Sequence, residues 1–398
     1  MTEGGDDAFR AGVASALAGL AAEGRLRPDT GSASVIMGAG NDDLDAGRAY
    51  LAALADGGLA VPMWPREYGG LGATADQATV IGRELARYER PDLYPFGVGL
   101  SLVGPTLLTH GTPEQRARWL PAIRTGEQIW CQLFSEPDAG SDLAALTARA
   151  EADGDIWRIT GSKVWSSRAH YAKWGLLLSR TDPDVPKHAG ITAFAIDMGA
   201  PGVEVRPLRQ MNGDTHFNQV FLDGAAVPAE DRIGDVNKGW AVAITTLMHE
   251  RGAIGGGGGG GLGTEADVWS IARTATHTSP TLRARAVALY AELEVARWTA
   301  QRSRAAAKAG RPPGPEGSGA KLRLSANVKE LADLGIDAVG MSGVAGDEWP
   351  ERQTLFLTGP SMSIRGGTDE IQRNIIGERV LGLPPEPRVD KDRPFRER

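Results

Sequence analysis

The sequence predicts an α+β protein that is mostly helical. We expect an N-terminal α-helical domain (1–126), a middle β-barrel or sandwich domain (127–235), and a C-terminal four-helix bundle with its tail (236–398). The chain of 398 residues is too long for one compact core, which suggests two or three domains. Its apolar period is helical, then strand-like, then helical again. The central strands are not separated by helices, which excludes a Rossmann unit.

Composition restricts the class of protein. Apolar residues make up 41% of the chain and charged residues 23%, as in ordinary globular proteins. The net charge of −7 argues against a general nucleic-acid or membrane-surface role. No apolar run approaches the roughly 18 residues that span a bilayer, and the acidic N-terminus does not resemble a signal peptide.

Cysteine and histidine usage favours neither disulfides nor a metal. The single cysteine, Cys131, excludes an internal disulfide framework and suits a cytoplasmic protein. We expect Cys131 to be a small buried hydrophobe rather than a nucleophile. The six histidines stand nowhere at metal-ligand spacing, so we expect no metal.

The N-terminal region shows helical periods with clear boundaries. Ala46–Leu59 reads as a helix with a double-glycine stop, and Thr74–Arg90 opens on a threonine N-cap and ends before Pro91. Pro62–Gly72 is too rich in proline and glycine for regular structure, so we expect a folded loop. Thr112, followed by Pro113 at the first helical position, begins a helix that we expect to run to about Trp119.

The middle region shows a strand period. Asp153-Gly154 is a strong hairpin signal between two alternating runs. Several short strands at close spacing indicate a small barrel or sandwich. The other expected strands are Lys163–Ser166, Trp174–Ser179, Gly190–Met198, Val203–Leu208 and Phe217–Leu222.

Four helices are expected after residue 235. Gly239–Glu250 places Trp240, Ile244 and Leu247 on one stripe, with Glu250 at its edge. Two longer amphipathic helices cover 281–309 and 320–340, and the fourth lies in 361–383. Together they make the number for an antiparallel bundle. The seven glycines 255–261 predict a flexible loop rather than a phosphate loop, because no Gly-Lys-Ser/Thr follows.

The stretch 361–383 combines a double glycine with a capped helix. Gly366 and Gly367 can turn the backbone sharply or let a ligand approach it. Thr368 is a good N-cap, and Asp369 and Glu370 place negative charge in the first turn, where the helix dipole favours it. The pattern by itself predicts a well-capped surface helix.

Two further stretches carry polar groups at unusual positions. The segment 131–142 clusters hydroxyls and acids with Pro137 and Gly140, so it is either a plain interdomain turn or a loop that presents backbone N–H groups to a polar ligand. At 248–251, Arg251 falls on the apolar stripe of its helix. Charged groups seldom lie in such a stripe without a partner or a function, although a helix end curving into solvent explains the pattern equally well.

These three stretches together resemble the acyl-CoA dehydrogenase family of flavoproteins, over about residues 50 to 388. Four ordered motifs at the spacing of the family make this a strong signal. The family fold is an N-terminal α domain, a middle β domain and a C-terminal four-helix bundle. The motifs are Phe134–Asp142; Gly161–Ser167 with Ala169–Ala172; Phe217–Asp223 with Val227-Pro228; and Gly366–Leu383.

The resemblance implies FAD, with its flavin ring between the β domain and the bundle. It places the Ser135 hydroxyl near the reactive nitrogen and Trp165 beside the ring. The residues that it implies for FAD are Gln132, Leu133, Phe134, Ser135, Ser141, Trp165, Ser166, Ser167, Thr368 and Glu370. The residues that it implies for the substrate are Ser141, Met248, Arg251 and Gly367.

The resemblance also implies α,β-dehydrogenation of an acyl thioester, in which a carboxylate removes the α proton and the flavin accepts the β hydride. Many family members keep this base immediately before the Gly-Thr of the last motif, where this chain has Gly366. One branch places it on the first bundle helix before an arginine, and that position is Glu250, followed by Arg251. We therefore expect Glu250 to be the base, and the Gly366 backbone N–H to hold the thioester oxygen.

Two family features are missing from this chain. The Arg-x-x-Phe-Gly motif that reaches a neighbouring subunit's FAD is absent, because no phenylalanine occurs between Phe221 and Phe356. The FAD-contacting glutamine of the third bundle helix is also absent, and Gly340 stands nearest its place. Either a homo-oligomer binds FAD differently, or a paralogous partner in a heterotetramer supplies these groups.

Other functions on the same fold stay open at this point. They are a flavin monooxygenase or oxidase acting on a non-thioester, and a non-catalytic subunit of a heteromeric dehydrogenase. For the dehydrogenase we expect an acyl-CoA or acyl-carrier-protein thioester as substrate, and an electron-transfer flavoprotein or similar acceptor. The acyl group itself cannot be inferred from these residues.

Overall fold

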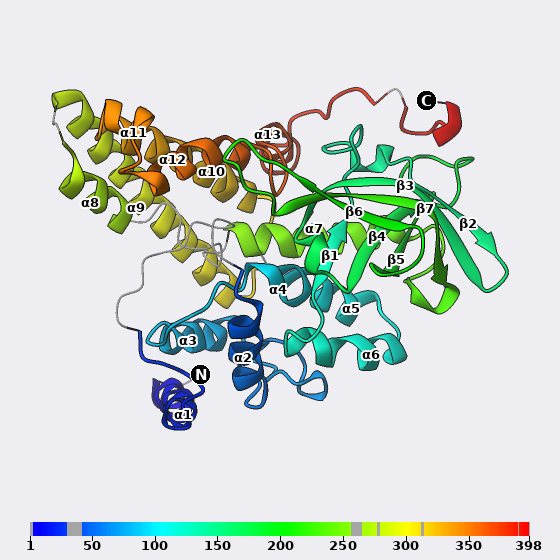
Figure 1. Ribbon diagram of the computed structural model, residues 1–398, viewed down its shortest axis with the longest axis horizontal. Helices are drawn as coiled ribbons and strands as arrows, with labels where there is room; N and C mark the ends of the chain where they lie inside the picture. The colour runs from blue at the N-terminus through cyan, green and yellow to red at the C-terminus, as the bar shows by residue number, and fades with distance from the viewer. Residues whose placement is uncertain are drawn as a thin grey trace.

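The computed structural model describes residues 3–29, 42–255, 265–276, 279–311, 314–388 and 390–397. A helical region, a β region and a second helical region follow one another along the chain, as the sequence predicts (Figure 1). The predicted glycine loop 255–261 lies outside the described residues except for Gly255, the last residue of its helix.

The N-terminal helices begin at the caps that the sequence predicts. Thr74 and Thr112 each form a capping box, with Gln77 and Gln115 as the reciprocal partners. A π-helical turn, 99–103, joins the fourth helix to the fifth. The helices are α1 (Glu3–Ala22), α2 (Leu44–Ala55), α3 (Ala75–Leu85), α4 (Tyr94–Val98), α5 (Gly104–His110) and α6 (Pro113–Arg124).

The ends of three N-terminal helices differ from the prediction, and the first of them, α2, stops at Ala55 rather than Leu59. Helix α3 stops at Leu85 rather than Arg90, because the following residues pair with an earlier segment: Glu89 donates its backbone N–H to the Arg27 carbonyl at 2.8 Å. Helix α6 continues five residues beyond Trp119 in spite of Pro121. Its apolar face, with Trp119 and Ile123 buried, holds the last turn against the core.

The β region is one eight-stranded mixed sheet. The strand order is β6-β7-β3-β2-β4-β5-β8, and β1 pairs in parallel with β4. The predicted hairpin at Asp153-Gly154 joins β2 to β3 in antiparallel register, and the run predicted at 163–166 belongs to β3. The strands are β1 (Trp130–Leu133), β2 (Arg149–Asp153), β3 (Ile156–Ser167), β4 (Trp174–Arg180), β5 (Ile191–Asp197), β6 (Val203–Leu208), β7 (Phe217–Pro228) and β8 (Arg232–Ile233).

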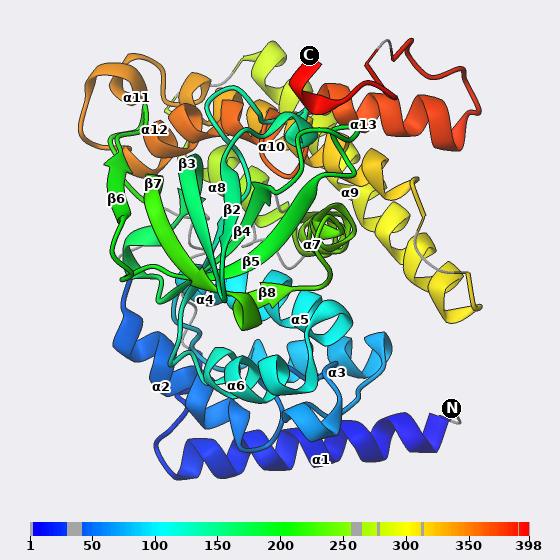
Figure 2. The same ribbon diagram turned by 90° about the vertical axis from the view of Figure 1, so that its right-hand side faces the viewer.

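A cluster of three tryptophans joins the N-terminal helices to the sheet. The rings of Trp119 on α6, Trp130 on β1 and Trp174 on β4 have centroids 5.4 to 5.8 Å apart. The same hydrophobic cluster contains buried residues of α7, the helix that directly follows the β region. Helices that precede and follow the sheet along the chain therefore pack together on this face of it (Figure 2).

The C-terminal helices are arranged around α10. This helix packs against α7, α8 and α9, and against the α12–α13 region. The long helices at 281–309 and 320–340 are confirmed, but the terminal helix is short and α8 was not predicted. The helices are α7 (Gly239–Gly255), α8 (Glu265–Thr274), α9 (Pro280–Lys308), α10 (Gly317–Asp337), α11 (Met341–Ala345), α12 (Pro350–Thr358) and α13 (Asp369–Ile375).

The described residues contain neither a membrane-spanning helix nor a cluster of metal ligands. None of the helices within them is long and apolar enough to cross a membrane. Nor do those residues contain a group of three His, Cys, Asp or Glu side chains placed to hold a metal ion. Cys131 is fully buried on β1, and burial raises the pKa of its thiol, as expected of a packing residue.

Candidate active site

The segment 132–135 comprises the last two residues of β1 and the two residues that follow it. Leu133 and Phe134 are buried, and their side chains belong to the core. Gln132 and Ser135 are half-buried. Of the four residues predicted to line FAD, two therefore have side chains within reach of a ligand, and Leu133 and Phe134 can offer only backbone groups.

A buried ion pair fixes this segment to β3. The Lys163 ammonium, whose side chain is fully buried, lies 2.8 Å from the Glu136 carboxylate and donates to the Phe134 carbonyl at 3.1 Å. Glu136 also accepts from the backbone N–H groups of Thr147 and Ala148, at 2.7 and 2.9 Å. The backbone that runs through Ser135 is thus held at both ends by charged hydrogen bonds.

Electrostatics in this pair favour the charged state of Glu136. Burial raises the pKa of the Glu136 carboxyl, but the Lys163 ammonium and the two backbone donors outweigh burial, so its pKa lies below the ordinary value. Sequence reasoning quoted both residues within motifs but assigned no role to either. A lysine at an inward position of a strand was the available signal.

Trp165 presents its ring to the surface from a strained backbone. It lies where the β3–β7 register shifts, has a φ of 62°, and its side chain is 60% exposed. A bulky residue rarely adopts this conformation, and such strain concentrates at functional sites. A flat apolar face offered in this way suits a planar ring such as a flavin.

The two serines after Trp165 have different surroundings. Ser167 is half-buried, whereas Ser166 is buried, and its hydroxyl has no hydrogen-bond partner among the described residues. The Ser166 carbonyl accepts from the Asn218 amide at 3.1 Å. Ser166 therefore faces the interior of the domain, and only Trp165 and Ser167 can contact a ligand outside it.

The Gly366-Gly367 turn is held by the helix that follows it. Both glycines have positive φ, 66° and 87°, and the Gln372 amide donates to the Gly366 carbonyl at 3.1 Å. Thr368 caps α13, as predicted, by accepting from the Ile371 backbone N–H at 3.2 Å. Glu370 is exposed.

Ion pairing anchors this turn on α10. Lys321, itself buried, lies 2.9 Å from Asp369, and Ser325 donates to the Met362 carbonyl at 2.7 Å. The buried face of α13 is therefore polar, with Asp369 and Gln372, while its isoleucines are half-buried. Burial raises the pKa of the Asp369 carboxyl, but the Lys321 ammonium together with hydrogen bonds from Ser363 and Ser325 outweighs burial, so its pKa lies below the ordinary value.

Helix α7 carries Glu250 on an unexpected face. The buried residues are Val242, Ala243 and Thr246, whereas Ile244 of the predicted stripe is 39% exposed. Thr246 is 3.0 Å from the Thr106 hydroxyl of α5, so a hydrogen bond fixes the rotation of the helix. Glu250 lies one turn beyond Thr246 on the same face and is half-buried.

The other residues predicted for the substrate are spread over three segments. Met248 is 60% exposed on α7, and Ser141 and Gly367 are exposed. Arg251 continues α7, but its side chain lies outside the described residues. The two alternative positions for the base are Glu250 and Gly366. Helix α10 contacts α7, which carries Glu250, and it also contacts the segments on either side of Gly366.

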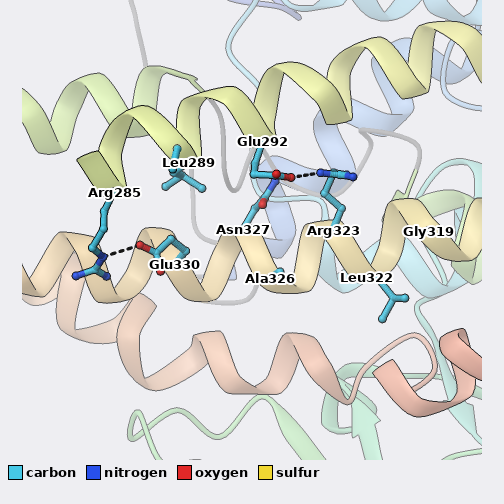
Figure 3. Close-up of a pocket in the computed structure, with 10 residues that line it drawn as sticks. Arg285, Leu289, Glu292, Gly319, Leu322, Arg323, Ala326, Asn327 and Glu330 are labelled. Carbon is cyan, nitrogen blue, oxygen red and sulfur yellow. Dashed lines mark hydrogen bonds and ion pairs between the residues drawn. The ribbon is translucent and has the colours of Figure 1, made fainter. Parts of the chain in front are cut away.

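A cavity of about 640 Å³ lies elsewhere, between α9 and α10 (Figure 3). Ion pairs cross it, between Arg285 and Glu330 and between Arg323 and Glu292. None of the predicted site residues lines it. It is not the candidate active site.

Comparisons with known proteins identify the family. Family models match residues 37–127, 131–224 and 237–381, as the N-terminal, middle and C-terminal domains of acyl-CoA dehydrogenases. Acyl-CoA dehydrogenase IpdE1 of Mycobacterium tuberculosis is 40% identical over 347 residues, which cover 85% of this chain and 88% of IpdE1. The chain belongs to the acyl-CoA dehydrogenase family. Members of this family are FAD flavoproteins and oxidoreductases, so the predicted family, fold and cofactor are confirmed.

Further relatives agree with this assignment. Acyl-CoA dehydrogenase FadE34 of Mycobacterium tuberculosis is 43% identical over 337 residues, 83% of this chain, but the match spans only 46% of FadE34. The structure of the Tcur3481-Tcur3483 steroid ACAD is 28% identical with a TM-score of 0.78, covering 97% of this chain and 99% of that one. The ChsE4-ChsE5 complex of Mycobacterium tuberculosis is 26% identical with a TM-score of 0.73, covering 96% and 99%.

Acidification should destabilise this acyl-CoA dehydrogenase through its buried carboxylates. Glu136 and Asp369 both have lowered pKa values in the folded state, so the unfolded chain takes up protons first as the pH falls. We expect the free energy of unfolding to be constant at pH values above about 5 and to decrease as the pH is lowered through about 4. Urea midpoints measured from pH 7 to pH 3 check this. Glu136→Gln should flatten the fall, and an unchanged slope in that variant would contradict the assignment.

Proposed function

We propose that this chain dehydrogenates an acyl-CoA between its α and β carbons, with the Glu250 carboxylate as the base that removes the α proton. The observation that carries the proposal is the position of Glu250 on the inward face of α7, in a chain whose alternative base position is Gly366. A positioned general base contributes on the order of 10²–10⁴-fold to such a step.

The remaining residues bind and orient the substrate. The Gly366 backbone N–H can donate to the thioester oxygen, which stabilises the charge that develops there as the proton leaves. Met248, Arg251, Ser141 and Gly367 would line the acyl-thioester site. FAD, when bound, supplies the acceptor for the β hydride. The proposed FAD set has exposed or half-buried side chains at Gln132, Ser135, Ser141, Trp165, Ser167, Thr368 and Glu370. The buried Leu133, Phe134 and Ser166 complete the set through their backbone groups alone.

Anaerobic titration tests the reaction directly. The purified flavoprotein would be mixed with butyryl-, octanoyl-, palmitoyl-, isobutyryl- and glutaryl-CoA and with a CoA ester of a steroid side chain. Loss of the flavin absorbance near 450 nm with at least one of them is the expected result. Failure of all of them, together with rapid oxygen-dependent turnover of a non-thioester, would instead support an oxidase or monooxygenase.

We propose a polycyclic, steroid-derived acyl-CoA as the first substrate to test. The proposal is supported by the likeness to the Tcur3481-Tcur3483 steroid ACAD over nearly the whole of both chains. A preference for the straight-chain esters in the same titration would count against it.

Reduced FAD would pass its electrons to an electron-transfer flavoprotein or similar acceptor. The single buried thiol of Cys131 favours a cytoplasmic location.

We propose that a paralogous subunit completes the FAD site. The missing Arg-x-x-Phe-Gly motif supports this, as does the likeness to ChsE4-ChsE5, whose name describes a complex of two proteins. The chain expressed alone should therefore hold well under one FAD per protomer, and co-expression with a paralogue should restore it. Flavin absorbance and size-exclusion chromatography measure both quantities. A full complement of FAD in the chain alone would exclude a paralogous contribution.

A further inference from the structure

The chain returns to the β domain after leaving the helical bundle. We call residues 384–388 and 390–397 the C-terminal strap; it runs from the α13 region back over the sheet (Figure 1). Phe395 donates its backbone N–H to the Val185 carbonyl at 3.0 Å, and Arg396 donates to the Pro183 carbonyl at 3.0 Å. The strap is thus hydrogen-bonded to the loop 181–190 between β4 and β5.

Arg180 connects the strap to residues 137–146, which we call the active-site loop because they contain Ser141. Its guanidinium lies 3.8 Å from the centre of the Phe395 ring. The same group donates to the Lys187 carbonyl at 2.6 Å and to the Ala144 carbonyl at 2.7 Å. Arg180 is buried at the end of β4, and the Phe395 ring covers one face of its guanidinium. Displacement of Phe395 would therefore expose the charge of Arg180 to solvent.

Lys187 makes a second connection through charge. Its ammonium lies 3.0 Å from the Asp142 carboxylate and 3.0 Å from the Asp390 carboxylate of the strap. The Lys187 side chain is 13% exposed, whereas the Asp390 and Asp142 side chains are 29% and 48% exposed, so solvent screens the outer side of this three-group cluster. Asp142 directly follows Ser141, the residue proposed to contact the thioester arm.

The active-site loop needs such support. Five of the six residues from 137 to 142 are exposed, and the segment is a turn outside the strands and helices of the sheet region. Two contacts from outside it, those of Lys187 and Arg180, hold the turn and the residues that follow it, and both side chains contact the strap. Asp390 is therefore linked to the residue after Ser141 through Lys187, and Phe395 is linked to Ala144 through Arg180.

We propose that the C-terminal strap positions the 140–146 turn to receive the acyl-thioester arm. The strap acts through Arg180 and Lys187, and it is a positioning element rather than a contributor of catalytic groups. The inference rests on the proposed function, because that function places the thioester arm at Ser141. It adds that a segment far from the base sets the affinity for the substrate.

Removal of the strap tests the proposal in two independent ways. The variants are Phe395→Ala, Asp390→Asn and a chain ending at Leu383, with Asp392→Asn as the matched control, since Asp392 is exposed two residues from Asp390. In the absence of any substrate, hydrogen exchange of peptides covering 140–146 should become faster in the three variants and stay unchanged in the control. This measurement does not depend on the reaction.

Kinetics give the second test. With the acyl-CoA that reduces the wild-type flavin fastest, KM should rise about tenfold while kcat per bound FAD stays unchanged, as for the loss of one charged hydrogen bond. Free coenzyme A should show the same loss of affinity by calorimetry. Unchanged hydrogen exchange and unchanged KM would overturn the proposal, as would a fall of kcat per bound FAD at constant KM. Faster exchange with no coenzyme A binding in the wild type would contradict the proposed function alone.

Discussion

Replacing Glu250 by glutamine should slow flavin reduction by the acyl-CoA substrate by roughly 10²–10⁴-fold, the usual contribution of a general base. Glutamine keeps the size of the side chain but cannot accept the α proton. Binding of the substrate and the FAD content should hardly change, because Glu250 lies within α7, whereas Lys163 and Glu136 anchor the cofactor segment. Anaerobic stopped-flow absorbance at 450 nm measures the reduction rate.

Two further variants make this test specific. His249→Gln changes the neighbouring position on α7 and should leave the reduction rate within about threefold, since it removes no proton acceptor in the proposed site. Adding Gly366→Glu to the Glu250→Gln variant should restore part of the rate if the two positions serve one site. The rescue will be incomplete because residue 366 has a φ of 66°, which is strained for glutamate. Near-full reduction by Glu250→Gln alone would disprove the assignment of the base.

Replacing Lys163 by methionine should cause the largest loss of stability. It leaves the Glu136 carboxylate buried without its cation, and breaking a buried ion pair in this way costs about 3–5 kcal/mol. The Phe134 carbonyl loses its donor at the same time. We therefore expect a lower free energy of unfolding, measured with urea, and a loss of FAD from the folded fraction.

A second substitution separates stability from cofactor binding. In Lys163→Met/Glu136→Leu both charges are removed, and much of the stability should return because no unpaired charge remains. FAD binding should stay weak, because the Phe134 carbonyl has lost its Lys163 donor, although the Val164 N–H still donates to the Ser135 carbonyl at 2.9 Å. Lys173→Met is the matched control: its pair with Asp197 is as short, 2.7 Å, but Lys173 is 52% exposed, so the loss should stay under about 1 kcal/mol. Full FAD content in the double variant would contradict the role assigned to the pair.

Local patterns predicted much of the secondary structure. The threonine caps at 74, 112 and 368 were confirmed because a cap depends on residues no more than three positions away. The Asp153-Gly154 hairpin was confirmed for the same reason. The order of helical and strand regions also followed directly from the change in apolar period.

The faces of individual helices could not be predicted in this way. In α7 the threonine at 246 is buried because α5 offers it a hydroxyl partner at Thr106, 140 positions earlier. In α13 the buried residues are Asp369 and Gln372, because Lys321 of α10 and the glycine turn provide their partners. Hydrophobic periodicity identifies Trp240 and Leu247 as core-packed but places Ile244 wrongly and misses Thr246, because it treats an inward polar residue as an exposed one.

The amino-acid residues alone thus predict the family, the order of the domains, FAD as the cofactor, and the absence of a carboxylate at position 366. The folded structure was needed to find that Glu250 shares the buried face of α7 with Thr246, that Lys163 pairs with Glu136, and that residues 390–397 return to the β domain. The difference lies in how far apart along the chain the interacting residues are. Caps, turns and periods are set by neighbours along the chain, whereas buried charges and polar faces are stabilised by partners that only folding brings within hydrogen-bonding distance.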